Sequence, residues 1–237
     1  MDIDRIAKAP GRLDLTGAPE GFDALVLADL ARARKGVVVF VARDGPRANA
    51  FADCLAFFAP EIEVLRIPSW DCLPYDRVGP TPGVSAARMA ALASLAHRPK
   101  SRHEPLVVVA TAPAMLQRVP PREAISAASY RARTGRDVAM AELERYFAVN
   151  GYVRASTVSE RGEFAIRGGV IDVFPPGAEE PVRLDLFGDT LESIRAFDPE
   201  TQRSTRQLSA IDLLPVSEAL LDAGARWSRA IRAWSPT

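Results

Sequence analysis

The first half of the chain alternates between continuous apolar runs and amphipathic stretches. GVVVFVA at 36–42 and PLVVVAT at 105–111 are β-branched runs typical of strands buried on both faces, and EVLRIP at 63–68 predicts a further strand. Stretches with the helical spacing of apolar residues lie at 22–35, 46–58 and 83–97. Strands that alternate with helices predict right-handed crossovers and a parallel sheet, so we expect an α/β domain over residues 1–118.

The pattern changes at VPPRE, residues 119–123. A predicted helix at 137–150 is followed by short runs of alternating apolar and polar residues, separated by tight turns. The strands predicted in this part are 152–158, 163–174, 181–187 and 190–197. We therefore expect a smaller α+β module over residues 119–215, whose stability does not depend on the first domain.

Strand alternation sorts the side chains of this second module onto two faces. In VRLDLF, Leu184 and Leu186 point to one side, while Arg183 and Phe187 point to the other. In GEFAIR, Arg167 likewise lies opposite its apolar neighbours. Two arginines and an exposed phenylalanine on one small sheet are typical of a protein-binding surface, because arginine and aromatic residues are favoured there.

The same residues also have a purely structural interpretation. Phe187 would lie under a neighbouring loop, and the arginines would pair with Asp172 and Asp185 in the adjacent strands. The pattern alone leaves both interpretations open. They differ in their effect on folding, because truncating an exposed binding residue leaves the melting temperature nearly unchanged, whereas truncating a core or ion-pair residue lowers it.

The stretch LTGAPEGFDA stands ahead of the first predicted helix, where a phosphate-binding loop belongs. The template is G-x-x-x-x-G-K-[ST]. Counted from Gly17, the chain has Phe22, Asp23 and Ala24 at the last three positions, and Gly21 comes one place early. An acid replaces the lysine that would neutralise phosphate, and a methyl group replaces the hydroxyl that would hold magnesium. The residues favour a glycine-containing turn that caps a helix; a phosphate loop, if ancestral here, has lost its chemistry.

The charge balance narrows the classes of partner. The 237 residues include 30 basic and 30 acidic side chains, which argues against bulk electrostatic binding to DNA or RNA. Two cysteines fit neither a disulfide framework nor a four-ligand metal site. The N-terminus has no apolar signal core and no run approaches membrane-spanning length, so we expect a cytoplasmic protein that does not bind membranes.

A search for catalytic chemistry identifies no site. The sequence contains no H-x-x-x-H, C-x-x-C or G-x-S-x-G pattern. The apolar run LVVVA ends at Thr111 rather than at the Asp-Glu pair that would hold magnesium in an ATPase. We therefore expect no catalysis, no metal and no cofactor in this chain.

Residues 160–203 resemble a signature shared by the excision-repair protein UvrB and the transcription-repair coupling factor, Mfd. The matching elements are Arg161-Gly162-Glu163-Phe164, Arg167-Gly168, Val170-Ile171-Asp172-Val173-Phe174-Pro175, Arg183-Leu184-Asp185-Leu186-Phe187 and Phe197-Asp198-Pro199. Residues 69–92 resemble Mfd in particular, through Trp70, Leu73-Pro74-Tyr75-Asp76 and Arg88. UvrB would carry a true phosphate loop and a tyrosine-rich hairpin, which this sequence lacks. The resemblance is therefore to the N-terminal UvrB-like module of Mfd, over roughly residues 13–216.

The resemblance implies a fold, a role and partners. The first domain would be a degenerate helicase-like, P-loop-type domain with LTGAPEGFDA as its degenerate loop, and the second would be a UvrB domain-2-like module. Mfd proteins recognise RNA polymerase stalled at a DNA lesion and recruit UvrA for nucleotide excision repair. The parts that bind RNA polymerase and move along DNA would lie downstream of this chain. The positions that match the family's UvrA contacts are Arg167, Arg183 and Phe187.

Two features set this chain apart from the family pattern. Gly188-Asp189 stands where relatives often carry two acids, which changes the turn at the edge of the expected interface. Residues 216–237 would be the truncated start of a segment that returns to the first domain. Within it, Trp227, Ile231 and Trp234 fall at i, i+4 and i+7, on one face of a predicted helix.

Two other functions compete with recruitment of UvrA. The first domain could retain ATP binding, but Asp23 and Ala24 argue against it. The chain could bind DNA directly, but its zero net charge and the missing hairpin argue against that.

Overall fold

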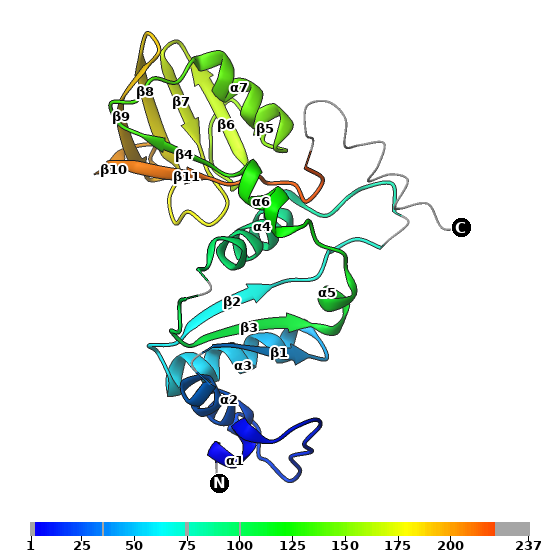
Figure 1. The fold of residues 1–237 in the computed structure, drawn as a ribbon. Coiled ribbons are helices and arrows are strands. Elements are labelled where there is room, and N and C mark those ends of the chain that lie inside the picture. The colour runs from blue at the N-terminus through cyan, green and yellow to red at the C-terminus, as the bar shows by residue number, and fades with distance from the viewer. Residues whose placement is uncertain (1–2, 35, 74–75, 100, 221–237) are drawn as a thin grey trace. The chain divides into compact units, whose positions relative to one another are not determined.

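The computed structural model describes residues 3–34, 36–73, 76–99 and 101–220, and it divides the chain into two compact units (Figure 1). Unit 1 comprises Met1–Asp71 and Arg98–Arg118, and unit 2 comprises Cys72–His97 and Val119–Thr237. The segment Cys72–His97 groups with unit 2, and the predicted domains over residues 1–118 and 119–215 stay a prediction. That the second module is stable by itself stays a prediction.

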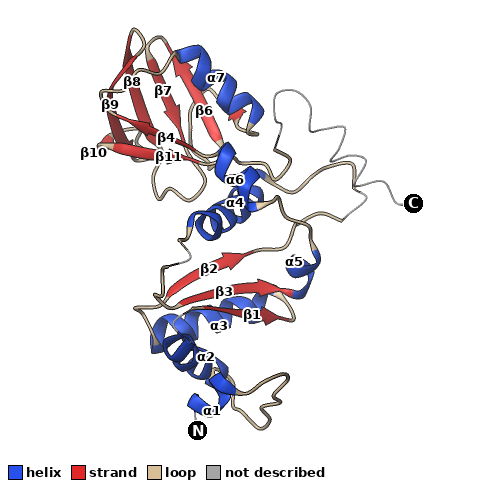
Figure 2. Cartoon of the chain, viewed as in Figure 1, coloured by secondary structure: helices blue, strands red, loops and turns tan. Residues whose placement is uncertain are grey.

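Unit 1 has helices packed against a three-stranded parallel sheet (Figures 1 and 2). Its strands, in the order β1-β3-β2, are β1 (Val37–Ala42), β2 (Glu63–Ile67) and β3 (Leu106–Thr111). Its helices are α1 (Ile3–Lys8), α2 (Phe22–Arg34), α3 (Gly45–Phe58) and α5 (Ala112–Leu116). The mixed α/β class is therefore confirmed, and the main elements closely match their predicted ranges.

The place of β1 in the sheet corrects one expectation. β3 lies between its two neighbours and all of its side chains are buried, as predicted for a strand covered on both faces. β1 is instead an edge strand: Val38 packs into the core formed with α2 and α3, while Val37, Val39 and Val41 are each nearly half exposed. The apolar run predicted a strand correctly but not its burial, because edge and central strands share a preference for β-branched residues.

Unit 2 is built around a six-stranded sheet with the order β10-β9-β8-β7-β6-β5 (Figure 2). These strands are β5 (Val153–Arg154), β6 (Glu163–Arg167), β7 (Val170–Val173), β8 (Val182–Phe187), β9 (Thr190–Phe197) and β10 (Ser204–Leu208). All neighbours are antiparallel except β5 and β6. A second, two-stranded sheet pairs β4 (Tyr130–Arg133) with β11 (Ala210–Leu213), and the helices are α4 (Pro82–His97), α6 (Arg122–Ala128) and α7 (Met140–Val149).

The strand predicted at 163–174 is divided by a tight turn at Gly168-Gly169, which joins β6 to β7. Gly168 has a φ of +61°, and a Cβ added to Gly169 would lie 2.7 Å from the carbonyl oxygen of Leu186. The Gly169 carbonyl in turn accepts a hydrogen bond from the Leu186 amide at 2.8 Å. Only glycine fits this turn, because any side chain would separate β8 from it. The strand predicted at 152–158 forms only over β5.

Aromatic side chains connect α7 to the sheet. The Phe147 ring stacks on the Phe164 ring of β6 with 4.9 Å between centroids, and both side chains are buried. The Tyr146 hydroxyl lies 3.0 Å from the carbonyl oxygen of Ala128 and 2.8 Å from that of Leu213. Burial raises the pKa of Tyr146, so its phenol stays a hydrogen-bond donor at neutral pH. This hydroxyl therefore ties α7 to β11 and to the end of α6.

A buried ion pair joins α4 to the segment that follows β11. Arg88 is fully buried, and its Nε and Nη2 donate to the two carboxylate oxygens of Glu218 at 2.5 and 3.1 Å. Glu218 is itself mostly buried. Because a buried charge is unfavourable unless it is paired, this contact fixes the two segments to each other within unit 2.

Within the described ranges, no helix is both long enough and apolar enough to cross a membrane. The predicted helix with Trp227, Ile231 and Trp234 lies outside the described residues.

The buried pair leads to a stability prediction. Arg88→Ala removes both guanidinium hydrogen bonds from a mostly buried carboxylate, so it should lower the opening free energy of unit 2 by about 3 kcal/mol. Amide hydrogen exchange in β6 to β9 measures this unit alone. The control is Arg131→Ala, which removes an exposed pair with Asp212 at 3.6 Å and should cost less than about 1 kcal/mol. Equal effects of the two substitutions would contradict the assignment.

Candidate protein-binding surface

The six-stranded sheet of unit 2 has one face in the core and one face directed away from it. Ile171, Leu184 and Ile194 are fully buried in the core with α7. Their neighbours along each strand therefore point to the opposite face, which we call the outer face. The outer face carries Arg167 of β6, Asp172 of β7, Arg183, Asp185 and Phe187 of β8, and Ser193 and Arg195 of β9.

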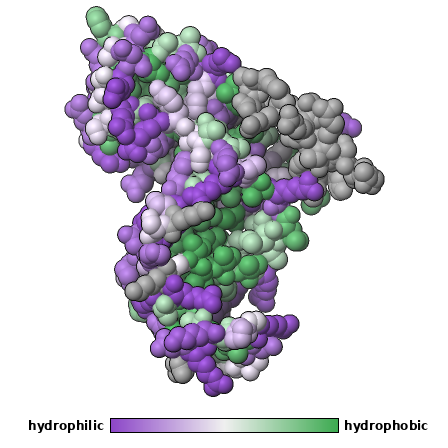
Figure 3. All heavy atoms as spheres, in the orientation of Figure 1, coloured by the Kyte–Doolittle hydropathy of each residue, from purple (hydrophilic) through white to green (hydrophobic). Residues whose placement is uncertain are grey.

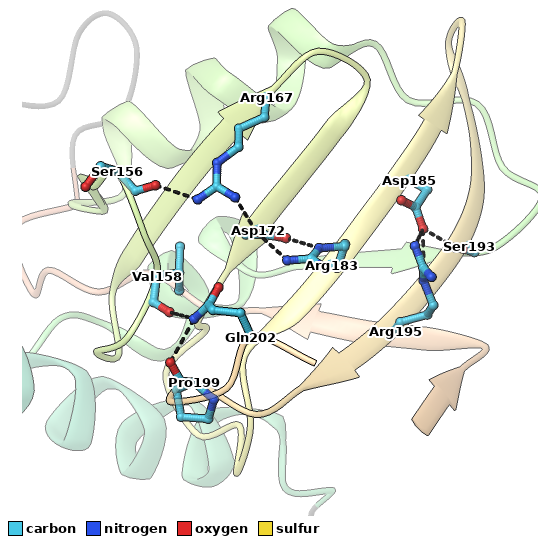
Figure 4. Close-up of polar contacts among 10 residues, drawn as sticks. All are labelled: Ser156, Val158, Arg167, Asp172, Arg183, Asp185, Ser193, Arg195, Pro199 and Gln202. Atoms are coloured by element: carbon cyan, nitrogen blue, oxygen red, sulfur yellow. Dashed lines mark hydrogen bonds and ion pairs between the residues drawn. The ribbon is translucent and has the colours of Figure 1, made fainter. Parts of the chain in front are cut away.

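Arg183 is held in place by Asp172. The two residues lie directly opposite each other on β8 and β7. The Nε and Nη2 atoms of Arg183 donate to the two carboxylate oxygens of Asp172 at 2.7 and 2.9 Å (Figure 4). Asp172 is 3% exposed and the Arg183 side chain is 20% exposed. The hydrogen bond to Asp172 raises the pKa of Arg183, which keeps the guanidinium charged.

Two further contacts complete the surroundings of this pair. The Arg183 guanidinium lies over the Phe197 ring, 5.0 Å from its centroid, so the ring restricts the side chain from a second direction. Arg167 lies at the edge of the same cluster, with its Nη1 atom 3.9 Å from Asp172 and its Nη2 donating to the Ser156 carbonyl at 2.5 Å (Figure 4). Half of the Arg167 side chain is exposed. Both arginines therefore share one buried carboxylate.

Phe187 lies at the end of β8, on the outer face. Its side chain is 76% exposed, and it stands opposite Thr190 just before the turn at Gly188. No loop of the described residues covers it. The structural interpretation therefore holds for Arg183, which pairs with Asp172, but not for Phe187, which is not under a loop.

Asp185 pairs with Arg195 and not with Arg167 or Arg183, the two arginines predicted to pair with the aspartates of this sheet. Its carboxylate accepts hydrogen bonds from the Ser193 hydroxyl and, at 3.2 and 2.7 Å, from Nε and Nη2 of Arg195 (Figure 4). Sequence reasoning missed Arg195 as part of this surface. Alternation along β9 would have identified it, because Arg195 lies between the buried residues Ile194 and Ala196 and must point outward.

A loop that is closed by hydrogen bonds lies beside this cluster. Asp198 accepts backbone hydrogen bonds from Thr201 and Glu200, which lower the pKa of its carboxyl group. Gln202 adopts a φ of 60°. Its side-chain Nε2 donates to the carbonyl oxygens of Val158 and Pro199 at 3.1 and 2.8 Å (Figure 4). These bonds fix the loop that follows β9 against the segment that precedes β6.

In unit 1, the glycine-containing loop leads into the N-terminus of α2. Gly21 has a φ of +84°, which positions the chain for the helix that begins at Phe22. Asp23 accepts a hydrogen bond from the Ala24 amide at 3.0 Å and also pairs with Arg47 of α3. The carboxylate thus lies at a helix N-terminus, where a bound anion is favoured. An open cavity of about 600 Å³ lies beside it, lined by residues that include Ala18, Pro19, Glu20, Arg43 and Arg47.

The described residues contain no group of three or more His, Cys, Asp or Glu side chains placed to hold a metal ion. In the view of Figure 3, hydrophobic residues gather over the sheet of unit 1, and hydrophilic residues cover much of unit 2.

Comparison with known proteins assigns relatives to both units. Residues 131–218 match a family model described as the UvrB interaction domain. A transcription-repair-coupling factor of Myxococcus xanthus is 39% identical over 215 residues, which cover 87% of this chain and 17% of the relative. The transcription-repair-coupling factor of Escherichia coli (strain K12) is 32% identical over 212 residues, covering 90% of this chain and 18% of the relative. The chain therefore spans less than a fifth of the length of these relatives.

The Asp172–Arg183 pair changes the stability expected of one variant. Removal of Arg183 leaves a buried carboxylate without its main partner, so Arg183→Ala should lower the opening free energy of unit 2 by about 2 kcal/mol. Asp172→Ala should also be destabilising, and the double variant should recover part of the loss. A double-mutant cycle read by hydrogen exchange in β6 to β9 should give a coupling energy above about 1 kcal/mol. Additive single effects would show that the pair contributes nothing to folding.

Proposed function

The chain belongs to the transcription-repair-coupling factors, and from that premise we propose that unit 2 recruits the repair protein UvrA. The outer face of the six-stranded sheet would make the contact, through Arg167, Arg183 and Phe187. In this role the chain links RNA polymerase stalled at a DNA lesion to nucleotide excision repair. Contacts with RNA polymerase and DNA would come from parts of the family's proteins that this chain does not span, and the role places the protein in the bacterial cytoplasm.

The exposure of Phe187 is the observation that carries this proposal. A phenylalanine with three quarters of its surface in water loses the free energy that burial would provide, and it gains that energy only when a partner covers it. It lies on the same face as Arg167 and Arg183, within the region that matches the UvrB interaction domain. Aromatic and arginine side chains together are the usual main contributors to binding energy in protein interfaces.

The fixed position of Arg183 also favours tight binding. A free arginine side chain loses rotamer entropy when a partner immobilises it. Arg183 is already immobilised by Asp172 and by the Phe197 ring. It therefore presents its guanidinium in a defined orientation before the partner arrives, and binding costs correspondingly less entropy.

For unit 1 we propose that the chain neither binds nor hydrolyses ATP. The Asp23 carboxylate lies at the N-terminus of α2 and is paired with Arg47. It would repel a phosphate at the position where a phosphate loop attracts one.

The proposed surface predicts the effect of three substitutions on UvrA binding. Arg167→Ala, Arg183→Ala and Phe187→Ala each remove a main contact, so each should cost about 2 kcal/mol, or about a thirtyfold loss of affinity for UvrA. Isothermal titration calorimetry with purified UvrA measures the dissociation constant. Phe187→Ala should leave the melting temperature unchanged, because the side chain is exposed. The affinity of Arg183→Ala for UvrA must be measured well below the lowered melting temperature of that variant.

Matched controls separate this surface from general effects of arginine or phenylalanine loss. Phe57 of α3 is 80% exposed, and Arg131 of β4 is an exposed arginine paired across two strands with an aspartate. Phe57→Ala and Arg131→Ala should bind UvrA as the unmodified chain does. If UvrA does not bind the unmodified chain, recruitment by this module is wrong; if it binds and all three variants bind equally well, the contact lies on another surface.

A further prediction concerns the binding and hydrolysis of ATP by unit 1. Labelled ATP with magnesium should show no saturable binding to the chain, and phosphate release should not exceed a buffer blank, because Asp23 repels the phosphates. The measurement requires protein that is free of contaminating ATPase. Turnover that depends on magnesium and co-purifies with the chain would show that unit 1 retains a nucleotide site.

A further inference from the structure

Resting on the proposed function, we propose that Arg195 is a further partner-binding residue, and that the surface it contacts on UvrA is rich in carboxylates. Arg195 lies on β9, directly opposite Arg183 of β8, and both point to the outer face. The interface would then extend across β6, β8 and β9 instead of ending at β8. Three guanidinium groups, those of Arg167, Arg183 and Arg195, would face the partner.

The pairing of two arginines across neighbouring strands is unfavourable for folding. Like charges that stand directly opposite each other in a sheet repel and destabilise it. The chain tolerates Arg183 beside Arg195 because each has its own aspartate: Asp172 binds Arg183 and Asp185 binds Arg195 (Figure 4). Because the buried Asp172 requires Arg183, a neutral residue could replace only Arg195 to avoid the repulsion. A requirement for positive charge on this face accounts for arginine at position 195.

The two aspartates lie inward and the arginines lie outward. Asp172 is almost completely buried and Asp185 is 23% exposed, whereas the Arg195 side chain is 42% exposed. Each arginine donates from its Nε and Nη2 atoms to its aspartate. Among the described residues, Nη1 of Arg183 and Nη1 of Arg195 donate no hydrogen bond. The acids therefore orient the guanidinium groups without covering their outer edges. Although the chain as a whole is neutral, this part of the face presents cationic donors.

These donors fit carboxylates on a protein better than phosphates on a nucleic acid. A guanidinium group binds either anion through paired hydrogen bonds. Phe187 on the same face requires an apolar contact, which a protein surface provides. A partner surface with carboxylates opposite the arginines and an apolar site opposite Phe187 satisfies all of these groups.

The test measures UvrA binding by Arg195 variants of the full 237-residue chain. Arg195→Ala should weaken binding about tenfold, and Arg195→Glu about a hundredfold or more, because it places a negative charge against carboxylates. Arg195→Lys keeps the charge and the contact to Asp185 but lacks the planar pair of donors, so it should bind with an intermediate affinity. Raising salt from about 0.05 M to about 0.2 M should weaken binding less for Arg195→Ala than for the unmodified chain.

Two comparisons decide the outcome. Arg131→Ala, which removes a more exposed arginine elsewhere in unit 2, should leave both affinity and salt dependence unchanged. If UvrA binds the unmodified chain and loses affinity with Phe187→Ala, but Arg195→Ala and Arg195→Glu bind within about twofold, the role of Arg195 is wrong while the proposed function stands. If Arg195 variants instead lose binding to duplex DNA and keep binding to UvrA, the face recognises phosphates and the carboxylate assignment is overturned.

Discussion

The outer face of unit 2 depends on the pairing of one buried carboxylate. A charge as buried as that of Asp172 is stable only with an opposite charge and hydrogen bonds around it. Strand register supplies them, because the pleat that directs Ile171 and Leu184 into the core also sets Asp172 opposite Arg183. The same residues therefore stabilise the sheet and define its surface.

This double role separates the residues of the surface into two kinds. Phe187 contributes little to the folded state by itself, so stability does not explain its presence at an exposed position. Arg183 is required by Asp172 whether or not a partner binds. Loss of binding in an Arg183 variant is therefore ambiguous unless folding is measured beside it, whereas loss of binding in a Phe187 variant reports the contact directly.

Sequence reasoning recovered what is local and missed what depends on distant residues. Alternation placed Arg183 and Phe187 opposite Leu184 correctly, since a strand's two faces follow from adjacent residues alone. It could not place β1 at the edge of its sheet, because strand order is not encoded in one strand's composition. The Arg88–Glu218 pair joins residues 130 positions apart, and no local pattern connects them. The antiparallel pairing of β4 with β11 was missed for the same reason.

Aspartates have opposite effects in the two units, and burial geometry explains the difference. Asp23 lies at the N-terminus of α2 and pairs with Nη2 of Arg47, so a carboxylate stands at the place where an external anion would bind. Asp172 and Asp185 lie beneath their arginines, in the sheet, and bind only the inner donors of each guanidinium group. In unit 1 the carboxylate thus places a negative charge at a helix N-terminus, whereas in unit 2 the carboxylates orient guanidinium groups on the outer face. A neutral chain presents cationic groups on one face by this placement of its acids, without any excess of lysine and arginine.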